Sequence, residues 1–247
     1  MLFQAKFLEF LPALKQLTWQ DSLEKSDLLT HSFLLEKENN LTMYYAPHNE
    51  YINPDAQVLI VGITPGWKQM KTAYTKVIDS LYSNETEEQI LKQAKLAASF
   101  SGQMRTNLVS MLDQCGLADA LDIPTTGRLF TSHRFRLHTT SIIRYPVFYK
   151  GKNYTGHVPA IHQSEMLKYY IDNIFLKELT YMKESILIIP LGKVAEQVIR
   201  EVENMYSFTH LSGFPHPSGA NGHRIKQFKR NYEQLKSTIK NWSHRQI

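Results

Sequence analysis

Two short and almost wholly apolar stretches constrain the fold of this chain more than any other feature. They are residues 58–61 (Val-Leu-Ile-Val) and residues 185–189 (Ser-Ile-Leu-Ile-Ile), and each is followed by a glycine and then by a helical pattern. A strand with helices on both sides has such a continuous pattern, because both of its faces are buried. The sequence therefore predicts an α/β fold with a mainly parallel sheet, in which ligands bind beyond the carboxyl ends of the strands.

The other elements follow from apolar spacing and cap residues. Thr18 or Asp21 is expected to cap the second helix. The expected helices cover residues 4–18, 20–37, 67–82, 86–98, 103–115, 163–179, 193–204 and 223–242, and further strands are expected within 137–144 and 208–211. We expect a single domain over residues 1–247, with an N-terminal helical extension at about residues 1–50.

Composition excludes several classes of protein. The 247 residues contain no apolar run near the roughly 18 residues that span a bilayer, so no membrane association is expected. Cys115 is the one cysteine, which excludes a disulfide framework, a zinc ribbon and a four-cysteine cluster. His157 and His162 stand five apart with Pro159 between them, so they cannot share a helix face as zinc ligands. We expect a cytoplasmic protein without metal or cofactor.

Positive charge is concentrated in two blocks of a chain with net charge +5 and a pI near 9.1. Residues 123–168 and residues 223–247 each contain seven basic residues and one acid, whereas residues 1–57 contain four lysines and eight acids. Basic blocks favour a polyanionic partner, since each neutralised phosphate releases counterions. The first block also contains several aromatic residues, a combination that suits unpaired bases.

The turn after the first strand has the sequence Gly-Ile-Thr-Pro-Gly at residues 62–66. A phosphate-binding P-loop is excluded, because Trp67 and Gln69 stand where it needs glycine and a hydroxyl residue. A nucleophile elbow at Thr64 is disfavoured, because Pro65 has no N–H for an oxyanion hole. Two interpretations remain: a turn that presents its backbone and Thr64 to a ligand, or a tight turn between strand and helix.

The loop after the last strand has the sequence His-Pro-Ser-Gly-Ala-Asn-Gly at residues 216–222. The imidazole of His216 can donate a hydrogen bond to a developing negative charge, and Ser218 with the glycine amides can hold a phosphate. Arg224 and the basic residues after it add positive field. The alternative is a loop histidine that is satisfied by the backbone.

Together these two motifs resemble the signature motifs of the uracil-DNA glycosylase superfamily. Residues 100–116, 139–144 and 189–195 resemble three further segments in the family's order, so the resemblance covers about residues 55–235. It implies a three-layer α/β/α sandwich with a short parallel sheet. It also implies a monomeric enzyme that flips a damaged base, uracil or a related one, out of DNA and hydrolyses its N-glycosidic bond.

The resemblance also implies a set of site residues. His216 matches the histidine that hydrogen-bonds the leaving base, Phe100 matches the stacking aromatic, and Trp67 is a local rival of Phe100. The implied catalytic residues are His216 and Thr64, and the implied substrate-binding residues are Gly62, Ile63, Pro65, Gly66, Trp67, Phe100 and Ser141. The implied DNA-binding residues are Ser218, Gly219, Ala220, Asn221, Arg224 and Arg144.

Two positions depart from the family pattern. Thr64 stands where an Asp or Asn positions or activates water, and a neutral hydroxyl is a poor general base. Ser141 stands where several branches read the base with an Asn. Two alternatives therefore stay open: a catalytically weak relative that binds damaged DNA, and a small-molecule or nucleotide-binding enzyme on the same fold. All three hypotheses expect the turn at 62–66 and His216 to meet at one cavity.

Overall fold

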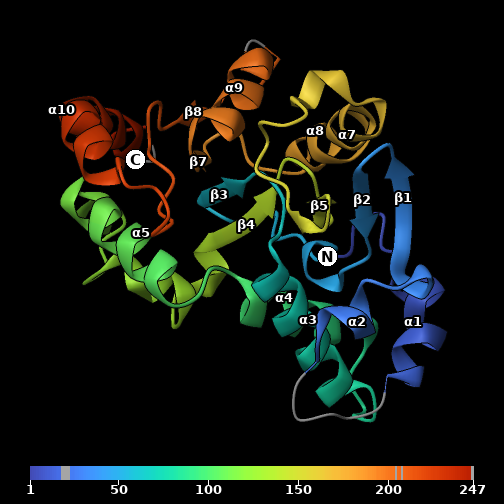
Figure 1. Cartoon of the computed structure of the whole chain (residues 1–247). Coiled ribbons are helices and arrows are strands. Elements are labelled where there is room, and N and C mark those ends of the chain that lie inside the picture. Colours follow the sequence, from blue (N-terminus) through green and yellow to red (C-terminus); the bar gives the residue numbers. More distant parts are fainter. Residues whose placement is uncertain (18–22, 204, 207, 246–247) are drawn as a thin grey trace. The chain divides into compact units, whose positions relative to one another are not determined.

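The computed structural model describes residues 1–17, 23–203, 205–206 and 208–245. The chain divides into two compact units (Figure 1). The first unit consists of Met1–Ile52, Ile63–Ser99 and Ser141–Thr180, and the second of Asn53–Gly62, Phe100–Thr140 and Tyr181–Ile247. The expected single domain with an extension at about residues 1–50 stays a prediction.

A parallel sheet forms the centre of the second unit. Its strand order is β4 (Leu137–Ser141), β3 (Val58–Gly62), β7 (Leu187–Pro190) and β8 (Thr209–His210). Both β3 and β8 run parallel to β7, with Leu187 opposite Val58 on one side and opposite Thr209 on the other. The two predicted apolar strands are therefore confirmed as the neighbouring central pair.

Helices cover both faces of this sheet. Side chains alternate between the faces of a strand, and Val58, Ile60, Leu187 and Ile189 pack in one core cluster with α5, α6 and α10. The bounds of these helices are Gln103–Gln114, Leu117–Ala120 and Arg224–Ser243. On the other side, α9 (Lys193–Val202) contacts β7 through buried residues outside that cluster. The predicted three-layer α/β/α fold is therefore confirmed.

The first unit contains an antiparallel sheet that the sequence analysis missed. Its strand order is β1 (Leu34–Glu38), β2 (Leu41–Tyr44), β5 (Val147–Tyr149) and β6 (Lys152–Asn153). Its helices are α1 (Phe7–Gln16), α2 (Lys25–Leu28), α3 (Trp67–Ser80), α4 (Glu87–Ala98), α7 (Glu165–Tyr170) and α8 (Leu176–Leu179), with a π-helical segment at Ile171–Phe175. Short 3₁₀ turns lie at His31–Phe33, Pro47–Asn49 and Ile161–Gln163 here, and at Thr126–Phe130 and Arg134–Arg136 in the second unit.

The predicted long helix over residues 20–37 is wrong, because the described part of that range has only the short helix α2 and a 3₁₀ turn before the chain becomes a strand. Residues 34–38 form β1, and Glu38 pairs with Leu41 across a two-residue turn at Asn39 and Asn40. Asn39 has a φ of +52°, which asparagine tolerates better than most residues, so this pair favours a tight hairpin. The predicted caps Thr18 and Asp21 lie outside the described residues. Within the described residues, no helix is long and apolar enough to cross a membrane.

Candidate active site

The Thr64 hydroxyl holds the turn at residues 62–66 in place. In the first unit, Thr64 Oγ1 donates to the carbonyl oxygen of Tyr145 at 2.8 Å and accepts from the amide of Val147 at 3.1 Å. Both the hydroxyl proton and a lone pair are thus engaged with the segment that enters β5. The catalytic role of Thr64 stays a prediction, but its observed contacts are those of a positioning residue.

The backbone amides at the end of the turn are also engaged within the first unit. The Gly66 amide donates to Gln69 Oε1 at 3.2 Å, and the Trp67 amide donates to Asn153 Oδ1 at 3.1 Å. Gly62 and Pro65 are buried, whereas Ile63, Gly66 and Trp67 are half-buried. The beginning of α3 therefore offers fewer free N–H groups to an anion than a phosphate-binding turn does.

His216 approaches the backbone of Gly192 closely in the second unit. Gly192 has a φ of +86°, and a Cβ added there would lie 3.2 Å from His216 Cβ. The Gly192 amide also donates to the carbonyl oxygen of Phe214 at 3.1 Å. Since Gly192 follows β7 closely, this contact brings His216 to the carboxyl end of the parallel sheet, where the fold predicts ligand binding.

The imidazole of His216 has a defined tautomer. Its Nδ1 accepts a hydrogen bond from the Ser218 amide at 3.2 Å, so the proton of the neutral ring resides on Nε2. Burial lowers the pKa of His216 below its usual 6.5, which keeps the ring neutral at pH 7. Nε2 makes no hydrogen bond within the described part of the chain. His216 is thus a neutral donor with its N–H available.

Hydrogen bonds fix the backbone around His216. Asn221 Nδ2 donates to the carbonyl oxygen of His216 at 3.1 Å and to Gln227 Oε1 at 3.0 Å. Arg224 Nη1 donates to the carbonyl oxygen of Ser218 at 3.0 Å. Of the residues predicted to bind DNA here, Gly219 and Ala220 are exposed, while Asn221 and Arg224 also hold the loop together.

Phe100 and Ser141 are largely buried at different places. Phe100 is 7% exposed, packs in the core cluster of the second unit, and has a φ of +27°, which is strained for an aromatic residue. Ser141 is the buried last residue of β4. Thr64, Trp67 and Ser141 belong to the first unit, and His216 and Phe100 to the second. That these residues meet at one cavity stays a prediction.

Arg144 does not contact a ligand phosphate in this arrangement, and its assignment as a DNA-binding residue is corrected. Its side chain is 1% exposed, and Nη2 lies 3.3 Å from Glu178 Oε2 in a buried ion pair. Nη1 donates to the carbonyl oxygen of Phe3 at 2.7 Å. Breaking a buried ion pair by withdrawing one partner is costly, so the guanidinium is held in the core of the first unit.

The last of the basic residues at 128–136 lies at the opposite end of the strands from His216. Arg136 directly precedes β4, and its carbonyl oxygen accepts from the amide of Gln57, which directly precedes β3. Arg136 is therefore at the amino ends of β3 and β4, whereas Gly192 and His216 are at the carboxyl end of the sheet. Arg224 of α10 brings positive charge to the His216 loop.

Sequence reasoning missed two residues that support the His216 loop. Gly192 gave a signal, since a glycine between a buried strand and a helix often marks a close approach of the backbone. Asn107 gave none: its Nδ2 donates to the carbonyl oxygen of Pro217 at 2.9 Å, a contact between positions 110 apart in the chain.

The second unit thus defines an α/β/α protein with a histidine loop at the carboxyl end of its parallel sheet. No family model matches the sequence. The chain is 52% identical over 225 residues to "Uncharacterized protein YoxB" of Bacillus subtilis (strain 168), over 90% of this chain and 88% of that protein. It therefore belongs to the same family as YoxB.

A solved structure is also similar in the path of its backbone. The crystal structure of SMUG2 from Pedobacter heparinus matches with a TM-score of 0.47 and 14% identity, over 98% of this chain and 100% of that chain. The likeness is remote, and nothing about activity follows from it.

Proposed function

We propose that this protein is a DNA glycosylase-like enzyme that flips a damaged base, uracil or a related one, and hydrolyses its N-glycosidic bond. The observation that carries the proposal is the state of His216: a neutral imidazole whose Nδ1 accepts from the Ser218 amide and whose Nε2–H is available. A preorganised neutral donor is suited to an oxygen that gains negative charge as a bond breaks.

In this proposal the leaving base takes the electron pair of the N-glycosidic bond. Negative charge develops on the base, and His216 Nε2–H hydrogen-bonds the oxygen that bears it. Water adds its oxygen to the sugar carbon, and its released proton balances the charge of the base. Ser218, Gly219 and Arg224 are the proposed contacts to the DNA backbone, with Ala220 and Asn221 entering the gap left by the flipped base. As part of this proposal, the protein is cytoplasmic and acts as a monomer on DNA.

A second candidate is a weakly catalytic relative that binds damaged DNA, and the contacts of Thr64 favour it. The Thr64 proton is donated to Tyr145 and its oxygen accepts from Val147, so the hydroxyl is a poor candidate to activate water. Stabilisation of the leaving base would then supply most of any rate enhancement.

The test incubates the protein with end-labelled single- and double-stranded oligonucleotides that carry uracil, hypoxanthine or a mismatch, followed by alkaline cleavage of abasic sites. We expect strand breaks that fall by about 10²–10³-fold in His216→Ala, the usual effect of removing one such donor. His223→Ala is the matched control, because His223 is an exposed histidine that directly follows the loop, and it should cleave like the wild type.

The other outcomes separate the candidates. If the wild type binds the damaged strands and cleaves none, the enzyme proposal is wrong and the binding relative is favoured. If it neither binds nor cleaves, both are wrong. Equal cleavage by His216→Ala and the wild type would remove His216 from the reaction.

A further inference from the structure

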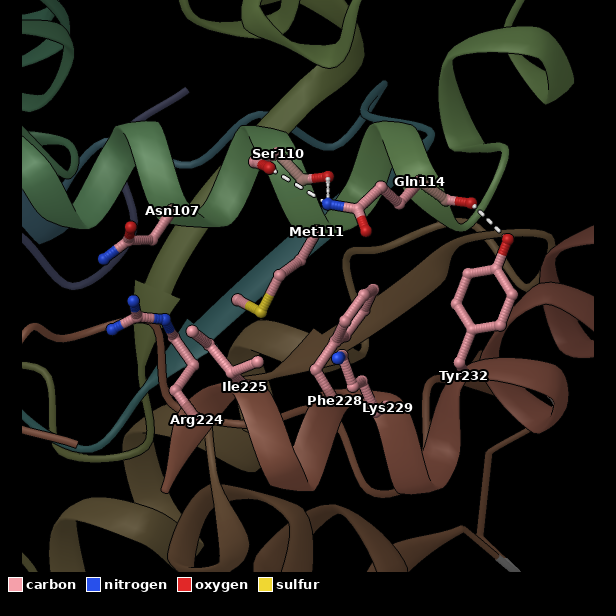
Figure 2. A pocket seen from close by; sticks show the side chains of 9 residues that line it. All are labelled: Asn107, Ser110, Met111, Gln114, Arg224, Ile225, Phe228, Lys229 and Tyr232. Atoms are coloured by element: carbon pink, nitrogen blue, oxygen red, sulfur yellow. Dashed lines mark hydrogen bonds between the residues drawn. The ribbon is translucent and has the colours of Figure 1, made fainter. Parts of the chain in front are cut away.

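A groove runs between α5 and α10 in the second unit (Figure 2). Its volume is about 490 Å³, within the roughly 300–1,000 Å³ of ligand-binding clefts. The side chains of Met111 and Phe228 are buried and give it an apolar floor. Arg224 and Lys229 contribute positive charge, and none of the described residues that line it is acidic. The groove thus combines an apolar surface with cationic groups.

Hydrogen bonds define the two ends of the groove. At one end, Tyr232 Oη donates to the carbonyl oxygen of Gln114 at 3.1 Å and ties the two helices together (Figure 2). At the other end, Asn107 and Arg224 line the groove and also donate to the backbone of residues 217 and 218. The groove therefore begins at the His216 loop and ends at the Tyr232 contact.

We propose that this groove binds a single-stranded segment of DNA that continues from the His216 loop. Bases would lie against Met111 and Phe228, and phosphates would contact Arg224 and Lys229. Helix α10 carries six basic residues and one acid, Glu233, which suits a polyanion and disfavours a basic occupant. The inference rests on the proposed function, because that function is what brings DNA to the His216 loop.

The apolar floor is what selects a single strand. Paired and stacked bases turn their faces toward one another, so a duplex presents mainly phosphates and leaves Met111 and Phe228 uncovered. A splayed base offers a flat face that packs on such side chains, while the cations hold the backbone on either side. Ile225, 63% exposed at the rim of the groove, extends this apolar surface.

The test measures binding rather than cleavage. Fluorescence anisotropy follows a labelled, undamaged oligo(dT) of about 15 nucleotides, a length within the range of single-strand binding sites. Lys229→Glu and Ser110→Glu each place a carboxylate in the groove from a different helix, at exposed positions. We expect each to weaken binding by about tenfold, and Lys229→Glu to reduce the salt dependence by about one phosphate contact.

Matched controls make the same change just outside the groove. Lys226→Glu on α10 and Thr106→Glu on α5 are exposed positions that do not line it. Each control should weaken binding by no more than about threefold, because its charge is exposed outside the groove, where salt screens it. If the controls weaken binding as much as the groove variants, the groove is not the site.

Two further results would overturn the proposal. One is a wild type that binds a duplex of equal length as tightly as the single strand. The other is oligo(dT) binding that is absent, or unchanged in both groove variants, as expected if a protein helix occupies the groove. Since the DNA is undamaged, groove-dependent binding without base excision would contradict the proposed function alone, and excision with unchanged binding in the variants would contradict this inference alone.

Discussion

The turn at residues 62–66 and the loop at residues 212–222 both follow strands of one parallel sheet, but they use their polar groups differently. In the turn, the Thr64 hydroxyl donates to Tyr145 and accepts from Val147. In the loop, His216 has one ring nitrogen engaged by the Ser218 amide and the other available. A side chain whose hydrogen bonds are internal supports geometry, whereas one that keeps a polar atom available can take part in chemistry.

The difference extends to the surrounding backbone. Gly66 and Trp67 donate to side chains of their own unit, so the turn is closed by its neighbours. Around His216, the side chains of Asn221 and Arg224 donate to backbone carbonyl oxygens of the loop itself, which fixes the loop while the imidazole Nε2–H stays available. We therefore expect changes near the loop to affect activity and changes near the turn to affect stability.

Apart from His216 itself, the largest effect is expected for Gly192→Ala. Gly192 has φ 86° and ψ 173°, a conformation that costs other residues about 1–3 kcal/mol, and the new Cβ would also meet His216 Cβ at 3.2 Å. We expect a loss of about 3 kcal/mol in the free energy of unfolding, a fall in Tm of roughly 2–4 °C per kcal/mol, and weaker cleavage. Thermal unfolding and the cleavage assay measure both.

Gly116→Ala is the control for backbone strain alone. Gly116 also has a positive φ, +82°, but a Cβ there would meet nothing within 4 Å. It should lower Tm less than Gly192→Ala and leave cleavage unchanged. If the two variants lose activity equally, the contact between Gly192 and His216 does not position the imidazole.

A smaller effect, on stability, is expected for Thr64→Val. The substitution keeps the shape but leaves the Tyr145 carbonyl and the Val147 amide without the hydroxyl, which costs about 1–3 kcal/mol where such groups are buried. Denaturant unfolding measures the loss. Thr75→Val is the matched control, since the exposed Thr75 hydroxyl only donates to the Lys71 carbonyl of its own helix. Its cost should stay within about 0.5 kcal/mol.

Thr64→Val also tests the comparison between the turn at residues 62–66, which supports geometry, and the His216 loop, which takes part in chemistry. Cleavage per folded molecule should fall far less than in His216→Ala, and Thr64→Ser should restore most of the lost stability. A loss of cleavage as large as that of His216→Ala, with unfolding unchanged, would make Thr64 a catalytic residue and contradict the contrast between turn and loop.

Much of the parallel sheet was predictable from sequence because its signals are local. Residues 58–61 and 185–189 are almost wholly apolar, a pattern that is typical of a strand covered on both faces. The secondary-structure prediction for residues 34–44 failed because their charged and apolar residues also fit helical spacing. Their strand state depends on Leu41 pairing with Tyr149, a contact between positions far apart in the chain.

The candidate site was predictable only in part, because local sequence patterns do not show contacts between distant positions. His216 is marked by its motif, but the support that it receives from Gly192 and the support that Asn107 gives to the loop depend on tertiary contacts. Arg144 is the opposite case, a residue that the sequence assigned to the site and the structure does not. A count of charges treats it as available to DNA, whereas its ion pair with Glu178 places it in the core.

The smallest expected effect concerns the ionisation of His216. Burial lowers its pKa below 6.5, so between the lowered value and 6.5 the unfolded chain binds more protons than the folded one. The contribution of His216 to stability therefore rises with pH through that interval and is constant above it. An NMR titration of the ring, assigned with His216→Gln, should give a pKa below 6.5, and cleavage should persist in that interval. A pKa at or above 6.5 would mean that the loop does not hold the ring neutral, and the contrast with Thr64 would lose its electrostatic basis.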